Sequence, residues 1–214
     1  MKKNSKVKKK FSLEIIRRLN LYLRNLKKIS ENKIEIISSR EITHYLNVTP
    51  EQFRKDLSYF GEFGKRGVGY NVRFLIHEIQ KIVGAHVVWN IALIGVGKVG
   101  SALLGFDGFS KFNIRITHAF DAEEEKIGQT REGLMIEAVG DLKKIIKKEN
   151  IKIAIIATPP EVAQGIANVL IDSGVKGILN FAPVFLKVPE NIFVSNVDMA
   201  CELESLIFFV KQFN

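Results

Sequence analysis

Six consecutive residues, Gly95-Val96-Gly97-Lys98-Val99-Gly100, have the types and the spacing to bind a phosphate group. They lie between the apolar residues 91–94, expected to form a strand, and residues 101–104, expected to continue a helix. In such a turn the first glycine permits the tight bend, the second lets the backbone approach a pyrophosphate, and the third lets helix and strand pack closely. The helix N-terminus also favours an anion. The run predicts a dinucleotide site; a turn that serves only packing is the alternative.

A carboxylate follows at the separation expected for ribose recognition. Asp121 ends the apolar segment 113–121 and lies 21 residues after Gly100. At that position a carboxylate can accept hydrogen bonds from the hydroxyls of the adenosine ribose. Residues 123–125, which follow Asp121 closely, are all glutamate, and no arginine adjoins them. A 2′-phosphate should be repelled there, so NADH and NAD⁺ are expected as ligands rather than their phosphorylated forms.

A second turn follows a later apolar segment. Thr158 is the last residue of the expected strand 152–158, and Pro159 follows it in the turn. The carboxyl ends of strands line the ligand crevice of an open α/β sheet. We therefore expect Thr158 and Pro159 to lie beside the glycine-rich turn and to bind the same cofactor.

The chain lacks the usual catalytic groups of a dehydrogenase. Such an enzyme needs a proton donor or acceptor near the nicotinamide. No Tyr-x-x-x-Lys pair occurs, three of the four histidines precede the glycine-rich run, and His118 lies within an expected strand. A cofactor site without a proton donor or acceptor indicates that the protein is a sensor rather than an enzyme. An NAD-dependent oxidoreductase with an extra N-terminal domain is the alternative, and a CoA- or nucleotide-binding regulatory module is a third.

Two helix starts lie close together in the first part of the chain. Residues 38–41, Ser-Ser-Arg-Glu, match a capping box and predict a short helix ending near Leu46. Thr49 can cap a second helix, over about residues 50–60, because Pro50 suits its first position. Two short helices joined in this way are typical of a helix-turn-helix.

The second helix has one apolar face, formed by Phe53, Leu57 and Phe60. Four glycines in residues 61–70 predict a β-hairpin after it, and a helix-turn-helix with such a wing is a winged-helix domain. The helix and wing can reach phosphates, base edges and the minor groove of double-stranded DNA. The residues expected to contact DNA are Gln52, Arg54, Lys55, Ser58 and Tyr59 of the helix and Lys65 and Arg66 of the wing. A small helical domain with a solvated basic face is the alternative.

The positive charge of the chain is confined to its first part. Residues 1–86 hold 19 Lys and Arg against 8 Asp and Glu, a net of +11, whereas residues 87–214 hold 13 against 15, a net of −2. Without its first ten residues the first part still carries +5. A basic module beside a nearly neutral one indicates that the first part meets a polyanion.

The pattern of apolar residues changes at residue 87, after which strands alternate with helices. This alternation predicts a mostly parallel, doubly wound sheet of the Rossmann type, and so an α/β fold overall. The expected divisions are a disordered basic arm (1–11), a winged helix-turn-helix domain (12–86), a Rossmann domain (87–198) and a C-terminal helix (199–214).

Composition excludes several other classes. One cysteine, Cys201, allows neither an internal disulfide nor a cysteine-rich metal site, so no metal is expected. No apolar run approaches the roughly 18 residues of a membrane span, and the basic N-terminus lacks the apolar core of a signal peptide. These features predict a cytoplasmic protein that does not enter a membrane.

Eight short segments, seen together, match one known family: 53–61, 63–64, 67–70, 95–100, 119–121, 157–160, 180–183 and 196–198. With them the chain resembles the Rex family of redox-sensing transcriptional repressors over about residues 12–213. The resemblance implies a repressor that binds operator DNA when NADH is scarce and releases it when NADH binds. It also implies a homodimer in which the C-terminal helix, residues 199–214, swaps into the partner.

Some members of the family join their domains by a polar link between an arginine, a tyrosine and an aspartate. The resemblance places these roles at Arg24, Phe106 and Asp198. Phe106 has no hydroxyl, so we expect this link to be altered.

Overall fold

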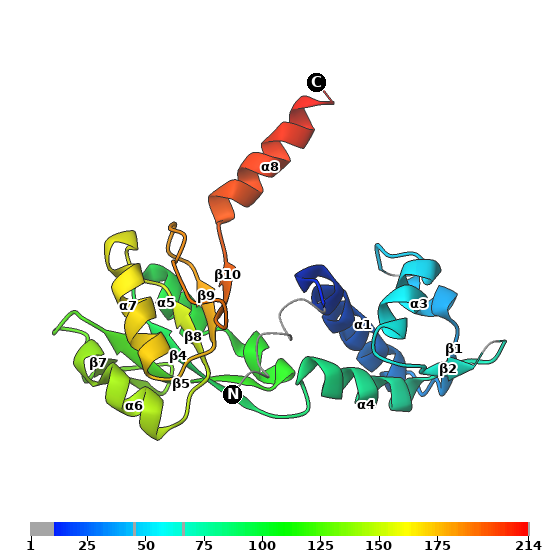
Figure 1. Ribbon diagram of the computed structural model, residues 1–214, viewed down its shortest axis with the longest axis horizontal. Coiled ribbons are helices and arrows are strands. Elements are labelled where there is room, and N and C mark those ends of the chain that lie inside the picture. Colours follow the sequence, from blue (N-terminus) through cyan, green and yellow to red (C-terminus); the bar gives the residue numbers. More distant parts are fainter. Residues whose placement is uncertain (1–10, 45, 66, 214) are drawn as a thin grey trace. The chain divides into compact units, whose positions relative to one another are not determined.

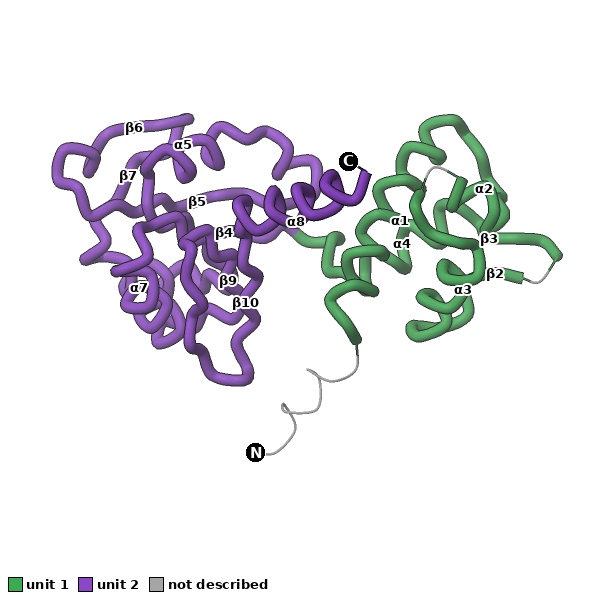
Figure 2. Tube along the Cα trace, turned by 90° about the horizontal axis from the view of Figure 1, so that it is seen from above, with its two compact units in different colours: residues 1–87 green, residues 88–214 purple. Residues whose placement is uncertain are grey.

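The computed structural model describes residues 11–213 apart from residues 45 and 66. The chain forms two compact units, Met1–Val87 and Val88–Asn214 (Figure 2). The division falls beside the change of sequence pattern at residue 87.

Four helices build the first unit around one apolar core. All four N-termini are capped by side chains, and the two predicted caps are confirmed: Ser38 and Glu41 form the capping box, and Thr49 accepts the N–H of Gln52. The largest buried side chains are Leu19, Tyr22, Leu26, Ile42, Phe53, Leu75 and Ile79. The helices are α1 (Leu13–Glu31), α2 (Ser39–Thr43), α3 (Pro50–Ser58) and α4 (Val72–Val83).

A small antiparallel sheet accompanies these helices, in the order β1-β3-β2. The strands are β1 (Ile36–Ile37), β2 (Gly64–Lys65) and β3 (Gly69–Asn71). The wing hairpin is confirmed, whereas β1 was not predicted because two residues carry no periodicity. Gly69 has φ +106°, and a Cβ there would lie 2.5 Å from the carbonyl oxygen of Ile37. Only glycine lets the wing approach β1 this closely.

The second unit contains a seven-stranded sheet in the order β10-β9-β8-β4-β5-β7-β6. All neighbours are parallel except β6, which runs antiparallel to β7. The strands are β4 (Trp89–Ile94), β5 (Ile114–Asp121), β6 (Thr130–Arg131), β7 (Leu134–Ala138), β8 (Ile153–Ile156), β9 (Gly177–Asn180) and β10 (Phe193–Asn196). From β4 the chain adds strands β5, β7 and β6 on one side, and from β8 it adds β9 and β10 on the other side. The order therefore reverses between β4 and β8, the place where open α/β sheets bind ligands.

Helices cover both faces of this sheet (Figure 1). Ala92 and Ile94 of β4 face one core with Leu142 and Ile146, whereas Ile91 and Leu93 face the other with Leu103 and Leu104. The alternation along β4 follows the two-residue period of a strand. The helices are α5 (Lys98–Leu104), α6 (Leu142–Lys148) and α7 (Pro160–Asp172), with short 3₁₀ segments η2 (Asp107–Phe112) and η3 (Val139–Asp141). The predicted alternation is confirmed; β6 and the two 3₁₀ segments were not predicted.

The last helix, α8 (Met199–Lys211), differs from the rest because every one of its residues is exposed. Asp198 caps it through the N–H groups of Ala200 and Cys201, at 3.1 and 3.0 Å. Its exposed apolar side chains are Met199, Leu203, Leu206, Ile207, Phe208, Phe209 and Val210, and Phe213 follows them. Despite this composition, none of the helices in the described part of the chain is long and apolar enough to cross a membrane.

Candidate nucleotide site and nucleic-acid interface

The glycine-rich loop lies at the point where the strand order reverses. Gly95 follows β4 with φ +93°, and its N–H donates to the carbonyl oxygen of Phe120 on β5 at 2.8 Å. On the other side, a Cβ on Gly95 would lie 2.6 Å from the carbonyl oxygen of Ala157, which follows β8. The loop is therefore held closely between the carboxyl ends of β5 and β8.

The three glycines of the fingerprint have different surroundings. A Cβ on Gly100 would collide with the carbonyl oxygen of Gly95, just as a Cβ on Gly95 would collide with that of Ala157. Packing therefore requires glycine at both positions. A Cβ on Gly97 would meet nothing within 4 Å. Packing accordingly explains the first and third glycines and leaves the second without a structural reason. An open position there is what the close approach of a pyrophosphate requires.

The other loop residues divide into buried and exposed ones. Val96 is buried, and its N–H is already donated to Asp121, at 2.7 Å. Lys98 and Val99 are exposed and form the first turn of α5. Their backbone is thus the part of the predicted site that solvent or a ligand can reach.

The carboxylate of Asp121 is fixed beside this loop. One oxygen accepts the N–H of Val96, and the other accepts the N–H of Glu123 at 3.0 Å. Burial by itself would raise the pKa of Asp121, but these two hydrogen bonds and the charge of Lys126 outweigh it and lower the pKa. Asp121 is therefore an oriented anion, as an acceptor for ribose hydroxyls must be.

A cation that the sequence reasoning overlooked lies at the same place. The Nζ atom of Lys126 is 3.3 Å from Oδ2 of Asp121 and 2.7 Å from Oε1 of Glu123. The expectation that a 2′-phosphate would meet only acidic side chains is therefore incomplete. A search for lysine as well as arginine after the glutamate run could have found it.

Thr158 presents an unpaired hydroxyl at the end of β8. Its Oγ1 is buried and, with Thr117 Oγ1, is without a hydrogen-bond partner among the described residues. Its methyl group lies 3.0 Å from where a Cβ of Gly95 would be. A buried hydroxyl without a partner costs free energy and is expected to have a role. The hydroxyl of Thr158 is therefore a donor that no described residue uses, and the adjacent Pro159 is exposed.

On α3 of the first unit, Arg54 is held in a defined orientation. Its Nη1 donates to Oγ of Ser39 and its Nη2 to Oε1 of Glu51, both at 2.7 Å. Because the side chain is still half-exposed, donors of the guanidinium remain on the surface. This arrangement presents Arg54 from a rigid helix, as a base or phosphate contact requires.

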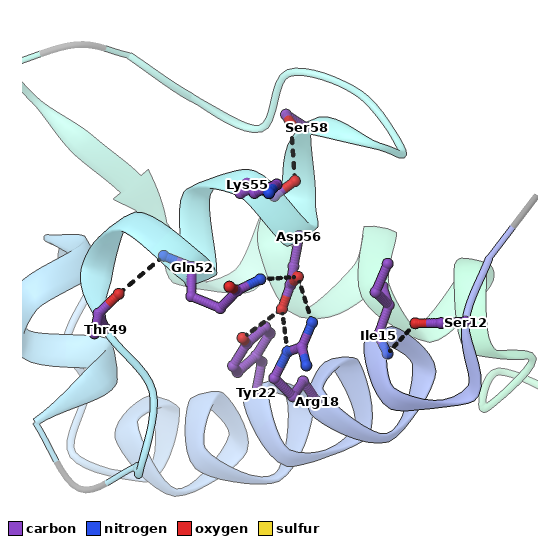
Figure 3. A network of polar contacts seen from close by, with 9 residues as sticks. All are labelled: Ser12, Ile15, Arg18, Tyr22, Thr49, Gln52, Lys55, Asp56 and Ser58. Atoms are coloured by element: carbon purple, nitrogen blue, oxygen red, sulfur yellow. Dashed lines mark hydrogen bonds and ion pairs between the residues drawn. The ribbon is translucent and has the colours of Figure 1, made fainter.

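The other residues predicted to contact DNA fall into two groups. Gln52 donates its amide to Oδ1 of Asp56 and Ser58 donates its hydroxyl to the carbonyl of Lys55, so both use donors within α3 (Figure 3). Lys55, Tyr59 and Lys65 are exposed. The predicted contact Arg66 lies outside the described residues.

A buried polar network joins α3 to α1, and the sequence reasoning missed it (Figure 3). Asp56 is completely buried. Arg18 binds its carboxylate through Nε–Oδ2 at 2.6 Å and Nη2–Oδ1 at 2.8 Å, and the hydroxyl of Tyr22 donates to Oδ2 at 2.7 Å. Asp56 lies three residues after the core residue Phe53 and so falls on the inward face of the helix. A carboxylate at such a position could have indicated a buried polar contact. The network sets the position of the predicted recognition helix.

The three residues of the expected link belong to different units. Arg24 is an exposed residue of α1 in the first unit. In the second unit Phe106 is exposed and stacks edge-to-face on Phe109, with ring centroids 4.9 Å apart, and Asp198 caps α8.

Comparison with known proteins extends over nearly the whole chain. The family model described as CoA binding domain matches residues 87–184, and the one described as putative DNA-binding protein N-terminus matches residues 10–58. The redox-sensing transcriptional repressor Rex of Chloroflexus aurantiacus is 42% identical over 198 residues, 92% of this chain and 93% of that protein. The Rex protein of Syntrophobacter fumaroxidans is 42% identical over 203 residues, which cover 94% and 97% of the two chains.

Solved structures agree with these relatives. RSP, a Rex-family repressor, has been crystallised with β-NAD⁺ and operator DNA; it is 33% identical, with a TM-score of 0.90 over 94% of this chain and 93% of that one. Its complex with β-NADH is 31% identical, with a TM-score of 0.83 over 94% and 95%. The relatives are named transcriptional repressors, which favours a repressor over the oxidoreductase alternative. With this identity over this length, the chain belongs to the Rex family of redox-sensing transcriptional repressors.

Proposed function

We propose that this protein binds operator DNA through residues 12–86, binds NADH or NAD⁺ through residues 87–198, and leaves the operator when NADH binds. The observation that carries the proposal is the open position at Gly97, beside the oriented carboxylate of Asp121, in a chain whose other unit is a basic winged helix. The complexes of RSP with operator DNA, NAD⁺ and NADH support this combination.

The cofactor has a place for each of its parts. The backbone of Gly97, Lys98 and Val99 would hold the pyrophosphate, and Asp121 would accept from the adenosine ribose. The hydroxyl of Thr158 would donate to the half of the dinucleotide that crosses β8. Bound NADH supplies no chemistry in this scheme; it shifts the protein between a conformation that fits the operator and one that does not.

The DNA contacts would come from the exposed face of α3 and from the wing. Arg54, Lys55 and Tyr59 would enter the major groove, and Lys65 would contact the backbone or the minor groove. Gln52 would contact DNA through its second amide N–H or its Oε1, and Ser58 through its hydroxyl as an acceptor, because the hydrogen bonds described above use one donor of each. Arg66, which lies outside the described residues, is proposed as a second contact of the wing.

The protein would act as a homodimer whose α8 helices cover one another's apolar surface. Seven apolar residues of α8 are exposed on one chain, more than a stable surface helix normally leaves uncovered. Two winged helices related by a two-fold axis would then meet two half-sites of a palindrome. The missing hydroxyl of Phe106 means that Arg24 and Asp198 would be coupled without a tyrosine between them.

A titration of DNA-bound protein tests the function. A fluorescently labelled palindromic, AT-rich operator is bound, and its anisotropy is followed while NADH, NAD⁺ and CoA are added separately. Release by NADH at a much lower concentration than by NAD⁺, with no release by CoA, is the expected result. Release by CoA alone would instead favour a CoA-responsive regulator, the alternative that the match at residues 87–184 supports. Asp121→Ala should weaken the NADH response and leave DNA affinity unchanged.

A further inference from the structure

The ammonium group of Lys126 lies between two carboxylates at the edge of the nucleotide site. Its Nζ is closer to Oε1 of Glu123, at 2.7 Å, than to Oδ2 of Asp121, at 3.3 Å. The side chain of Lys126 is largely buried, with 18% of its surface exposed, whereas that of Glu123 is 65% exposed. The single cation is therefore shared by two anions, and the three groups together carry one negative charge.

This geometry matters for the choice between NADH and NADPH, and the argument rests on the proposed function. The two ligands differ by one phosphate on the 2′-hydroxyl of the adenosine ribose, the part of the ligand assigned to Asp121. A phosphate at that position needs a cation that can bind it. Among the described residues, Lys126 is the cation that is paired with Asp121. Its charge is already engaged by Glu123.

We propose that Glu123 contributes to the selectivity for NADH over NADPH by holding the ammonium group of Lys126, so that this lysine is not available to a 2′-phosphate. Asp121 would still prefer a hydroxyl to a phosphate, so loss of Glu123 alone should reduce the selectivity without reversing it. The hydrogen bond that Lys126 donates to Glu123 raises the pKa of the lysine, so the side chain that Glu123 holds is a cation.

The competing explanation is a general negative field from residues 123–125. The neighbouring Glu124 is exposed, as Glu123 is, and carries the same charge. Within the described chain the ion pairs of Lys126 are those with Asp121 and Glu123, and none with Glu124 is formed. Glu124→Gln therefore makes the same change of net charge as Glu123→Gln without releasing the lysine, and it is a matched control.

Direct binding of NADH and NADPH is measured by calorimetry on the full-length wild-type protein and on E123Q, E124Q and the double variant E123Q/K126M. In E123Q we expect the ratio of the NADPH Kd to the NADH Kd to fall by about tenfold, the effect of one charged hydrogen bond. In E124Q the ratio should change little, and in the double variant it should return towards the wild-type value.

Two results would overturn the inference while the wild-type protein still binds NADH. An equal fall in E123Q and E124Q would show that only the field of the acidic run matters. A fall in E123Q that persists in the double variant would show that Lys126 is not the phosphate ligand. If the wild-type protein binds neither nucleotide, the proposed function itself fails, and the inference fails with it.

Discussion

Arg18 binds the buried carboxylate of Asp56 through two parallel hydrogen bonds, of 2.6 and 2.8 Å. The pair connects the first helix of the chain to the helix that carries the proposed DNA contacts, and Tyr22 and Gln52 complete the coordination of the carboxylate. Arg18 is itself mostly buried, with 24% of its side chain exposed. Geometry of this kind positions a helix more firmly than an isolated surface ion pair can.

Replacement of Arg18 by methionine should therefore destabilise the first unit. It leaves a buried carboxylate without its cation, and we expect the free energy of unfolding to fall by about 3 kcal/mol. Arg17→Met is the matched control, because the neighbouring Arg17 is exposed. Urea unfolding of the two variants measures the difference; equal stabilities would mean that the ion pair contributes nothing net.

The same network makes stability depend on pH. Burial alone would raise the pKa of Asp56, but hydrogen bonds from Arg18, Tyr22 and Gln52 outweigh it and lower the pKa. The unfolded state binds the proton more readily, so the stability from Asp56 is present above its unfolded pKa of about 3.9 and is lost as pH falls through the folded value. As the pH is lowered towards about 3, the urea concentration at the unfolding midpoint should therefore fall more steeply for the wild type than for D56N. Parallel pH profiles would contradict this.

Lys55 should contribute charge to DNA binding without setting the fold. In K55A the slope of log affinity against log salt should decrease in magnitude by roughly 1, the loss of one phosphate contact. Operator affinity, followed by anisotropy over a range of salt, gives the slope. Lys28→Ala removes an equal charge from the last turn of α1 and should leave the slope unchanged.

The two glycines Gly95 and Gly97 should respond differently to alanine. G95A forces a side chain into a left-handed backbone and against a carbonyl oxygen, so stability should fall by at least about 2 kcal/mol. G97A has φ −78° and open space, so stability should change by no more than about 0.5 kcal/mol. Its NADH Kd should nevertheless rise roughly tenfold or more, because the methyl group occupies the place of the pyrophosphate. Calorimetry and thermal unfolding of both variants separate the two effects. Unchanged NADH binding in G97A would refute the assigned pose.

Phe209→Asp should weaken self-association. A charge placed on the apolar surface of α8 must be buried when a second copy covers it, so the dimer Kd should rise by roughly 100-fold or more. Sedimentation velocity over a range of concentrations measures it. Gln212→Asp adds the same charge at the polar end of the helix and should have a much smaller effect. A wild-type protein that sediments as a monomer would remove the basis of the dimer.

Most elements could be predicted from the sequence because each has a local cause. Thr49 and Pro50 define the start of α3, and the two-residue alternation along β4 reflects burial on both faces. The strand β1 could not be predicted, since it exists only by pairing with β3 across more than thirty residues of sequence. Pairing between distant segments leaves no trace in a local pattern.

The candidate site divides in the same way. Glycine spacing and the position of Asp121 indicated the nucleotide site, because backbone approach and a fixed acceptor both constrain residue type. The roles of Lys126 and Asp56 depend on which side chains meet after folding. Arg54 was identified as exposed and basic, but its attachment to Ser39 and Glu51 required the structure.

The complete exposure of α8 has a consequence for regulation. A helix of 13 residues is marginally stable in water on its own, even with a good N-cap such as Asp198. Its order therefore depends on the surface that covers it, and if that surface is a second copy, helix formation and association form one equilibrium. Operator occupancy would then rise more steeply than the number of chains in the cell. A change in the rate at which this protein is synthesised would then alter repression of the same genes that respond to the redox state.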